Sequence, residues 1–127
     1  MEIKGKIISG MGKGTYFMSQ DIYVKQFQEK LKFRPFVGTL NIRLEEDQRN
    51  KIMKIPHEKF GLIHGKDKFG DVKFIKAVLN KKIVGALVFP AKTKHTEDVL
   101  EFISKENLRV SLNLKDGDLV FVDIEDK

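Results

Sequence analysis

Residues 60–89 place the strongest restriction on the fold, because three strand-like segments follow one another there with no helix between them. The segments are residues 60–63, 69–79 and 82–89, and the turns that separate them are short. Short turns join antiparallel neighbours, whereas parallel strands need a crossover of about a dozen residues or more. This stretch therefore predicts an antiparallel set and disfavours a doubly wound α/β sheet, in which helices alternate with strands.

Three more strands are expected, over residues 2–8, 38–44 and 119–124. Between positions 40 and 44, Leu, Ile and Leu alternate with polar residues, which is the pattern of a strand with one buried face. Residues 45–57 give mixed signals, and we expect a turn with one short helix there.

Two clearer helices are expected. The first covers residues 22–32, in which apolar residues recur at every fourth position, and Pro35 stops it. The second begins at a cap on Thr96, runs through Ile103 and continues irregularly to Arg109.

These elements must fit into 127 residues and 14.6 kDa, a size that suits one domain spanning residues 1–127. So short a chain with six or seven strands can hide its strand edges only by closing the sheet on itself. We therefore predict a mainly β protein, a small closed or nearly closed barrel of six or seven strands with two or three short helices.

The charge of the chain indicates attraction to phosphates without saying which phosphates. The formal net charge is +6 and the pI is near 9.5. The lysines are scattered among acidic residues, and the longest basic run is Lys81-Lys82. A dedicated nucleic-acid binder more often gathers its cations on one face, so this pattern favours a solvated surface and leaves nucleic-acid binding as the alternative.

The residue types that are missing exclude several kinds of chemistry. The sequence has no cysteine, which excludes disulfides, thiolate catalysis, zinc-thiolate sites and iron–sulfur clusters. Its three histidines lack the spacing of a zinc site. No apolar run approaches the ~18 residues of a membrane span, and the first residues do not resemble a signal peptide. We expect a soluble, cytoplasmic protein with no membrane partner.

A glycine-rich segment is the first candidate site. Gly10, Gly12 and Gly14 alternate with Met11 and Lys13, and consecutive backbone N–H groups in such a segment can turn toward one phosphate. It is neither a Walker A loop nor a dinucleotide fingerprint, because the required Gly-Lys-Ser/Thr and third glycine are missing. A plain glycine-rich turn between two strands explains the spacing equally well, although Lys13 could neutralise a phosphate oxygen.

Thr39 and Asn41 form a second candidate site. Residues two apart on a strand leave the same face, with Cα atoms ~6.6 Å apart. A hydroxyl and an amide oxygen suit Mg²⁺ only if nucleotide phosphates supply most of the negative charge. In isolation, two polar residues that face solvent are the commoner explanation.

Four stretches taken together resemble the CTP-dependent riboflavin kinases of archaeal type. They are residues 9–17 (SGMGKGTYF), 38–41 (GTLN), 85–95 (GALVFPAKTKH) and 108–118 (LRVSLNLKDGD). They occur in the family's order and span nearly the whole chain. The resemblance implies a six-stranded cradle-loop barrel that needs Mg²⁺ and converts CTP and riboflavin to CDP and FMN. We expect a monomer with no nucleic-acid partner, although the sequence itself leaves the oligomeric state open.

The resemblance also implies roles for particular residues. Thr39 and Asn41 would hold Mg²⁺, while Thr93 and Glu101, expected on or beside the second helix, would contact the flavin. We add the hypothesis that Glu101 is the catalytic residue, which orients the terminal ribityl hydroxyl or accepts its proton. The residues implied for the nucleotide are Met11, Gly12, Lys13, Gly14, Thr15, Tyr16, Glu106, Asn107, Leu108 and Arg109.

Two rival functions remain open at the level of sequence. One is a nucleic-acid-binding barrel without catalytic activity, which the pI favours and the scattered lysines disfavour. The other is a nucleotide or flavin sensor that keeps the barrel without the chemistry.

Overall fold

The computed structural model describes residues 1–9, 20–36, 38–65, 70–90 and 98–125. These residues form seven strands, three α-helices and one 3₁₀ helix. The strands are β1 (Glu2–Ile8), β2 (Leu40–Arg43), β3 (Gly61–Ile63), β4 (Val72–Leu79), β5 (Ile83–Pro90), β6 (Val99–Ile103) and β7 (Leu119–Ile124). The helices are α2 (Asp21–Leu31), α3 (Glu46–Met53), α4 (Leu108–Ser111) and the 3₁₀ helix η1 (His57–Lys59).

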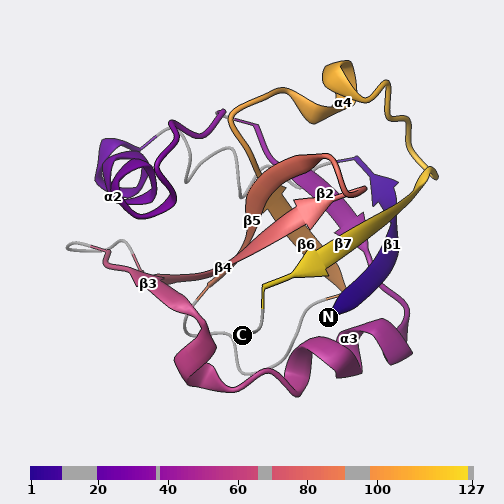
Figure 1. Cartoon of the computed structure of the whole chain (residues 1–127), viewed down its shortest axis with the longest axis horizontal. Helices are drawn as coiled ribbons and strands as arrows, with labels where there is room; N and C mark the ends of the chain where they lie inside the picture. Colours follow the sequence, from indigo (N-terminus) through magenta and orange to yellow (C-terminus); the bar gives the residue numbers. More distant parts are fainter. Residues whose placement is uncertain (10–19, 37, 66–69, 91–97, 126–127) are drawn as a thin grey trace.

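The sheet closes into a six-stranded antiparallel barrel. Its strands follow the order β4-β5-β6-β2-β1-β7, and β7 closes the ring by pairing with Ala77–Leu79 at the end of β4. The short β3 lies outside the ring and pairs with Val72–Phe74 at the start of β4. Figure 1 shows the strands curving around a common interior. The prediction of a small, mainly β barrel with short helices is confirmed.

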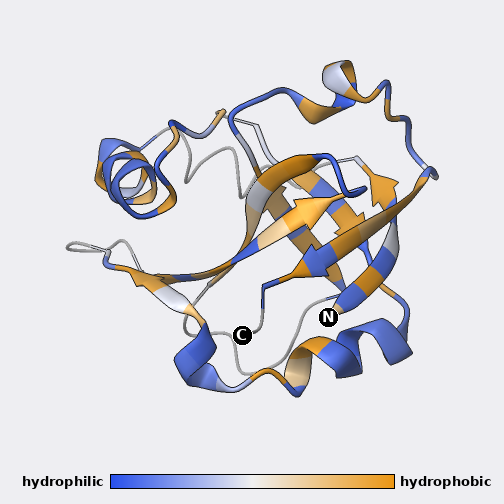
Figure 2. Cartoon of the chain, viewed as in Figure 1, coloured by the Kyte–Doolittle hydropathy of each residue, from blue (hydrophilic) through white to orange (hydrophobic). Residues whose placement is uncertain are grey.

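Alternation along the strands separates an inner from an outer face. In β1, Ile3, Gly5 and Ile7 are buried while their neighbours are exposed or half-exposed, and Figure 2 shows the resulting bands of apolar and polar residues. The inward side chains from all six barrel strands pack into one core. Its largest fully buried members include Ile3, Ile7, Ile42, Leu79, Leu87, Leu100 and Phe102.

A second apolar cluster lies outside the barrel wall, beneath α2. The helix presents Tyr23, Phe27 and Leu31, which are spaced four apart as the sequence predicted, to side chains of β3, β4, β5 and β6. The rings of Phe27 and Phe74 meet edge to face at 5.8 Å, a favoured aromatic geometry. The Tyr23 hydroxyl also donates to the Gly70 carbonyl at 2.7 Å. This cluster fixes α2 against the wall.

The predicted helix from Thr96 through Ile103 is wrong, because residues 99–103 form strand β6. Leu100 and Phe102 point into the barrel core and Glu101 points outward, so the segment alternates with period two. Both of its edges are paired, with β2 on one side and β5 on the other. Pairing on both sides outweighs the helical spacing of Val99, Leu100 and Ile103, because the local pattern is compatible with either structure.

The two ends of the barrel are covered differently. At one end α3, the short helix expected within residues 45–57, places Ile52 in the main core, and Ile55 follows it there. At the other end the chain after β6 crosses the opening, carries α4 and buries Leu108 (Figure 1). The described part of the chain contains no helix long and apolar enough to cross a membrane.

Candidate functional site

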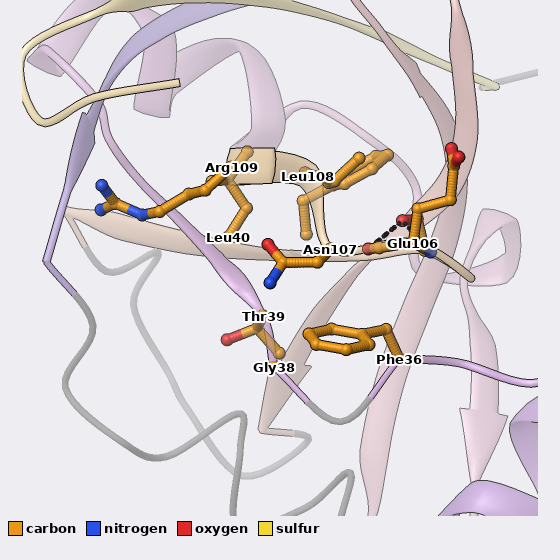
Figure 3. A pocket seen from close by; sticks show the side chains of 10 residues that line it. Phe36, Gly38, Thr39, Leu40, Glu106, Asn107, Leu108 and Arg109 are labelled. Carbon is orange, nitrogen blue, oxygen red and sulfur yellow. Dashed lines mark hydrogen bonds between the residues drawn. The ribbon is translucent and has the colours of Figure 1, made fainter. Parts of the chain in front are cut away.

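A cavity of about 180 Å³ lies at the α4 end of the barrel. Its lining comes from the segment before β2, from the end of β6 and from the chain that leads into α4, as Figure 3 shows. The residues are Phe36, Gly38, Thr39, Leu40, Phe102, Ser104, Glu106, Asn107, Leu108 and Arg109. The structure thus gathers Thr39 and all four nucleotide residues predicted from the second half of the chain around one space.

Short hydrogen bonds fix the walls of this cavity. The Phe36 backbone N–H donates to the Ser104 carbonyl at 2.7 Å, which ties the segment before β2 to the end of β6. The Ser104 hydroxyl donates to the Glu106 carbonyl at 3.0 Å and accepts from the Glu106 N–H at 3.1 Å. This reciprocal pair turns the chain toward the cavity, and the Asn107 side-chain oxygen then caps α4 by accepting from Val110 N–H.

Thr39 connects the cavity to a polar pair on the outer wall. Asn41 and Glu101 are directly opposite each other in the β2–β6 register, so their side chains leave the same face of the sheet. The Thr39 hydroxyl donates to a Glu101 carboxylate oxygen at 3.2 Å. Asn41 is only 6% exposed. The predicted metal residues and the predicted catalytic carboxylate are therefore neighbours, and Glu101 stands on a strand and not on the predicted helix.

Arg109 belongs to a charged network beside the cavity. Its Nη2 donates to the Ile8 carbonyl at 3.0 Å and to Asp116 Oδ1 at 2.5 Å. The Ser9 hydroxyl donates to the other oxygen of Asp116 at 2.6 Å. The bond from Ser9, followed by the bond and the charge of Arg109, lowers the pKa of Asp116 below its ordinary value of 3.8. The carboxylate therefore stays ionised at neutral pH, and this pairing is lost only as the pH falls through the lowered pKa.

Seven of the predicted site residues lie outside the described residues. They are Met11, Gly12, Lys13, Gly14, Thr15 and Tyr16 of the glycine-rich segment, together with Thr93. The roles predicted for them stay predictions. Ser9, which precedes the glycine-rich segment in the sequence, is described and belongs to the network with Arg109 and Asp116.

Sequence reasoning missed three residues of this site. Phe36 was not singled out, although it is a large aromatic residue just after Pro35; it is 40% exposed and lines the cavity. Ser104 and Asp116 also drew no functional prediction. No local pattern marks Asp116 for such a role, because its partners are Ser9, 107 positions away, and Arg109, 7 positions away.

A second hollow of about 480 Å³ is larger, but fewer groups that could bind or transform a substrate line it. It is lined by Glu2, Asn80, Lys81, Leu119 and Phe121 on the outer wall of the barrel. It contains none of the predicted site residues. The smaller cavity is therefore the candidate functional site, chosen for the groups that converge on it.

A comparison with protein families identifies the family of the chain. A model named for CTP-dependent riboflavin kinases, and described as a domain of unknown function (DUF120), matches residues 7–124. The chain belongs to this riboflavin kinase family. The match begins at the end of β1 and continues to the last residue of β7, so it covers the candidate site and all of the barrel except the first part of β1.

Individual archaeal relatives extend the riboflavin kinase match over nearly the whole chain. The chain is 49% identical to a riboflavin kinase of Methanobrevibacter smithii over 97% of its own length and 99% of the relative. It is 45% identical to a riboflavin kinase of Methanothermobacter thermautotrophicus, with 92% and 93% covered. For a riboflavin kinase of Archaeoglobus fulgidus the identity is 42%, and the chain spans 54% of that longer protein. These riboflavin kinase relatives show that the chain is a phosphotransferase.

Proposed function

We propose that the protein transfers the terminal phosphate of CTP to the ribityl hydroxyl of riboflavin, giving CDP and FMN. The observation that carries the proposal is the convergence of Thr39 and residues 106–109 on one cavity, with Glu101 hydrogen-bonded to Thr39. These groups come from segments more than 60 positions apart, and each was expected to serve this reaction. The family membership of the chain supports the same reaction.

The cavity has the size and lining for one part of a nucleotide. Complete ligand sites usually measure about 300–1,000 Å³, so about 180 Å³ suits a base and its sugar better than a whole nucleotide and a flavin together. Phe36 offers an aromatic face to a base. The Asn107 amide points into the space between Thr39 and Leu40 (Figure 3). In this proposal the triphosphate extends toward Arg109 and the end of β1.

Thr39 and Asn41 would hold Mg²⁺ beside those phosphates. The donor set fits, because the Thr39 hydroxyl gives its hydrogen to Glu101 and so keeps oxygen lone pairs for a cation. Among the described residues no group of three or more His, Cys, Asp or Glu could hold a metal, so most of the balancing negative charge would come from the nucleotide. When bound, Mg²⁺ would offset the charge on the transferring phosphate.

The remaining chemistry needs positioning and one proton acceptor. The ribityl oxygen forms a bond to the terminal phosphorus while the bond from that phosphorus to the bridging oxygen of CDP breaks. Such a transfer is catalysed mainly by alignment and charge stabilisation. Arg109 supplies positive charge for the phosphates, and Glu101 orients the attacking hydroxyl and takes its proton. Thr39 holds Glu101 in place for that role.

Removal of the Asn41 amide tests the proposed metal site. Asn41→Ala should raise the Mg²⁺ concentration needed for half-maximal activity about tenfold, since one of two protein oxygens is lost. Calorimetric titration of Mg²⁺ into the protein with CDP bound measures the same loss without turnover. Asn50→Ala, on an exposed position of α3 at the other end of the barrel, is the control. An unchanged Mg²⁺ requirement in Asn41→Ala would exclude Asn41 as a ligand.

The reaction itself is tested by incubating the protein with riboflavin, Mg²⁺ and each nucleoside triphosphate in turn, and then separating FMN by chromatography. FMN formation with CTP and not with ATP, GTP or UTP is the expected result. FMN formation with ATP would refute the choice of CTP while leaving riboflavin phosphorylation intact. Flavin binding without FMN would instead support a sensor. Salt-sensitive nucleic-acid binding without FMN would support the nucleic-acid-binding barrel.

A further inference from the structure

Ser9, Arg109 and Asp116 come from three separate segments and meet where β1 ends. Asp116 uses both of its oxygens, one for the Ser9 hydroxyl at 2.6 Å and one for Arg109 Nη2 at 2.5 Å. Arg109 Nη2 also donates to the Ile8 carbonyl at 3.0 Å. Figure 3 shows the Arg109 side chain extending from α4 past Leu40, away from Phe36. The carboxylate therefore fixes both the location and the rotation of the guanidinium.

The way in which Arg109 is held decides which of its donors can reach a ligand. A guanidinium has five N–H donors, and its Nη2 carries two of them. The bonds to Ile8 and Asp116 use both hydrogens of Nη2. An anion in the cavity would therefore be met by the Nη1 and Nε donors of Arg109, in a plane that Asp116 determines. Without Asp116, a single bond to the Ile8 carbonyl would leave the group free to rotate.

The ion pair is too exposed to serve mainly in folding. The side chains of Arg109 and Asp116 are 39% and 53% exposed. Ion pairs at such positions contribute little to the free energy of unfolding because water screens them. Its location offers a better explanation, since Arg109 lines the candidate nucleotide cavity and Ser9 is the last described residue before the glycine-rich segment.

We propose that Asp116 is a positioning residue for the nucleotide, which acts by holding the Arg109 guanidinium so that its free donors face the phosphates. This inference rests on the proposed function and adds to it a residue to which neither the sequence pattern nor the resemblance gave a role. Asp116 itself touches no substrate and acts through Arg109. Ser9 supports it by keeping the carboxylate from turning away.

Simple electrostatics predicts the opposite effect for the loss of this carboxylate. Asp116 partly neutralises Arg109, so its removal would strengthen the attraction of a phosphate if charge alone mattered. If Asp116 positions Arg109, its removal weakens nucleotide binding, because the freed guanidinium must be ordered again on binding. The sign of the change in affinity therefore separates the two explanations.

The test compares Asp116→Asn with Asp123→Asn in the full chain. Both variants lose one negative charge, but Asp123 lies near the end of β7, opposite Glu2 and far from the α4 end of the barrel. Asparagine at position 116 leaves Arg109 only one neutral oxygen, in place of a carboxylate that also accepts from Ser9. Because a charge-assisted bond is about twice as strong as a neutral one, we expect Asp116→Asn to weaken CTP and CDP binding by about five- to tenfold in calorimetry and Asp123→Asn to change it by less than about twofold. The melting temperatures of both should stay within about 2 °C of the parent.

Two further measurements test whether Asp116 affects nucleotide binding through Arg109. The double variant Arg109→Ala with Asp116→Asn should bind CDP no more weakly than Arg109→Ala alone, because Asp116 acts through Arg109. In NMR spectra of the ligand-free protein, the Arg109 Nε–H signal should show faster side-chain motion in Asp116→Asn than in Asp123→Asn. Equal or tighter nucleotide binding by Asp116→Asn, or losses that add in the double variant, would overturn the inference.

The inference and the proposed function fail in different ways. If the parent protein binds neither CTP nor CDP, the proposed function fails and the nucleotide part of the inference falls with it. If the parent binds them and makes FMN while Asp116→Asn is indistinguishable from Asp123→Asn, only the inference fails. The NMR comparison needs no nucleotide, and an Arg109 signal that does not change would reject the positioning role in either case.

Discussion

Replacing Glu101 by glutamine should reduce the turnover of riboflavin by about two orders of magnitude or more and leave the affinity for CTP within about twofold of the parent. The physical reason is that glutamine keeps the size of the side chain and an oxygen that can accept the Thr39 hydroxyl, but it cannot accept a proton from the ribityl hydroxyl. General-base groups of this kind typically contribute ~10²–10⁴-fold to rate. Steady-state turnover and calorimetric CTP affinity, measured on the same preparation, check both parts.

Two other variants serve as controls for Glu101→Gln. Glu2→Gln removes a carboxylate from an exposed position at the start of β1 and should leave turnover unchanged. Glu101→Asp keeps the charge but shortens the side chain, so it should recover part of the rate that Glu101→Gln loses. Equal losses of turnover and of CTP affinity in Glu101→Gln would refute the proposed role, because they would indicate a residue that supports binding in general.

The main features of the barrel could be predicted from the sequence because they depend on local patterns. Short turns after residues 63 and 79, alternation in 40–44 and helical spacing in 22–32 each involve neighbours along the chain. Residues 99–103 were misinterpreted because their local pattern fits a helix as well as a strand. What decides between them is the register with Leu40–Arg43 and with Ala86–Val88, and no local window contains that information.

The site was predictable only in part for the same reason. The spacing of Thr39 and Asn41 on one strand could be read locally, but the position of Glu101 beside them follows from strand pairing across 60 residues. Without the resemblance to a known family, two polar residues on a strand would have stayed an ordinary surface feature. Asp116 and Phe36 could be assigned to the site only from the folded structure, because they are held there by hydrogen bonds to Ser9 and Ser104, which are distant in sequence.

Replacing Gly85 by alanine should destabilise the barrel by about 3 kcal/mol or more, because the added methyl group has no space. An added Cβ would overlap the Ile103 carbonyl oxygen and approach the Phe102 ring to 2.6 Å. Gly85 is paired with Ala77 of β4, and this small pair leaves room for the fully buried Phe102 ring in the core. The melting temperature should fall by roughly 10 °C, and thermal unfolding followed by circular dichroism measures this.

The same substitution also tests how the fold supports the site, because Phe102 lines the cavity as well as filling the core. Gly70→Ala is the matched control, since an added Cβ there meets no atom of the described residues within 4 Å, and its melting temperature should stay close to that of the parent. Adding Phe102→Leu to Gly85→Ala should restore only part of the stability, because the overlap with the Ile103 carbonyl remains and backbone atoms yield less than a side chain. If Gly85→Ala were as stable as Gly70→Ala, β5 and β6 could move apart to accept the added methyl group without a loss of thermal stability. The close approach of these strands would then not be what holds Phe102 in the wall of the candidate cavity.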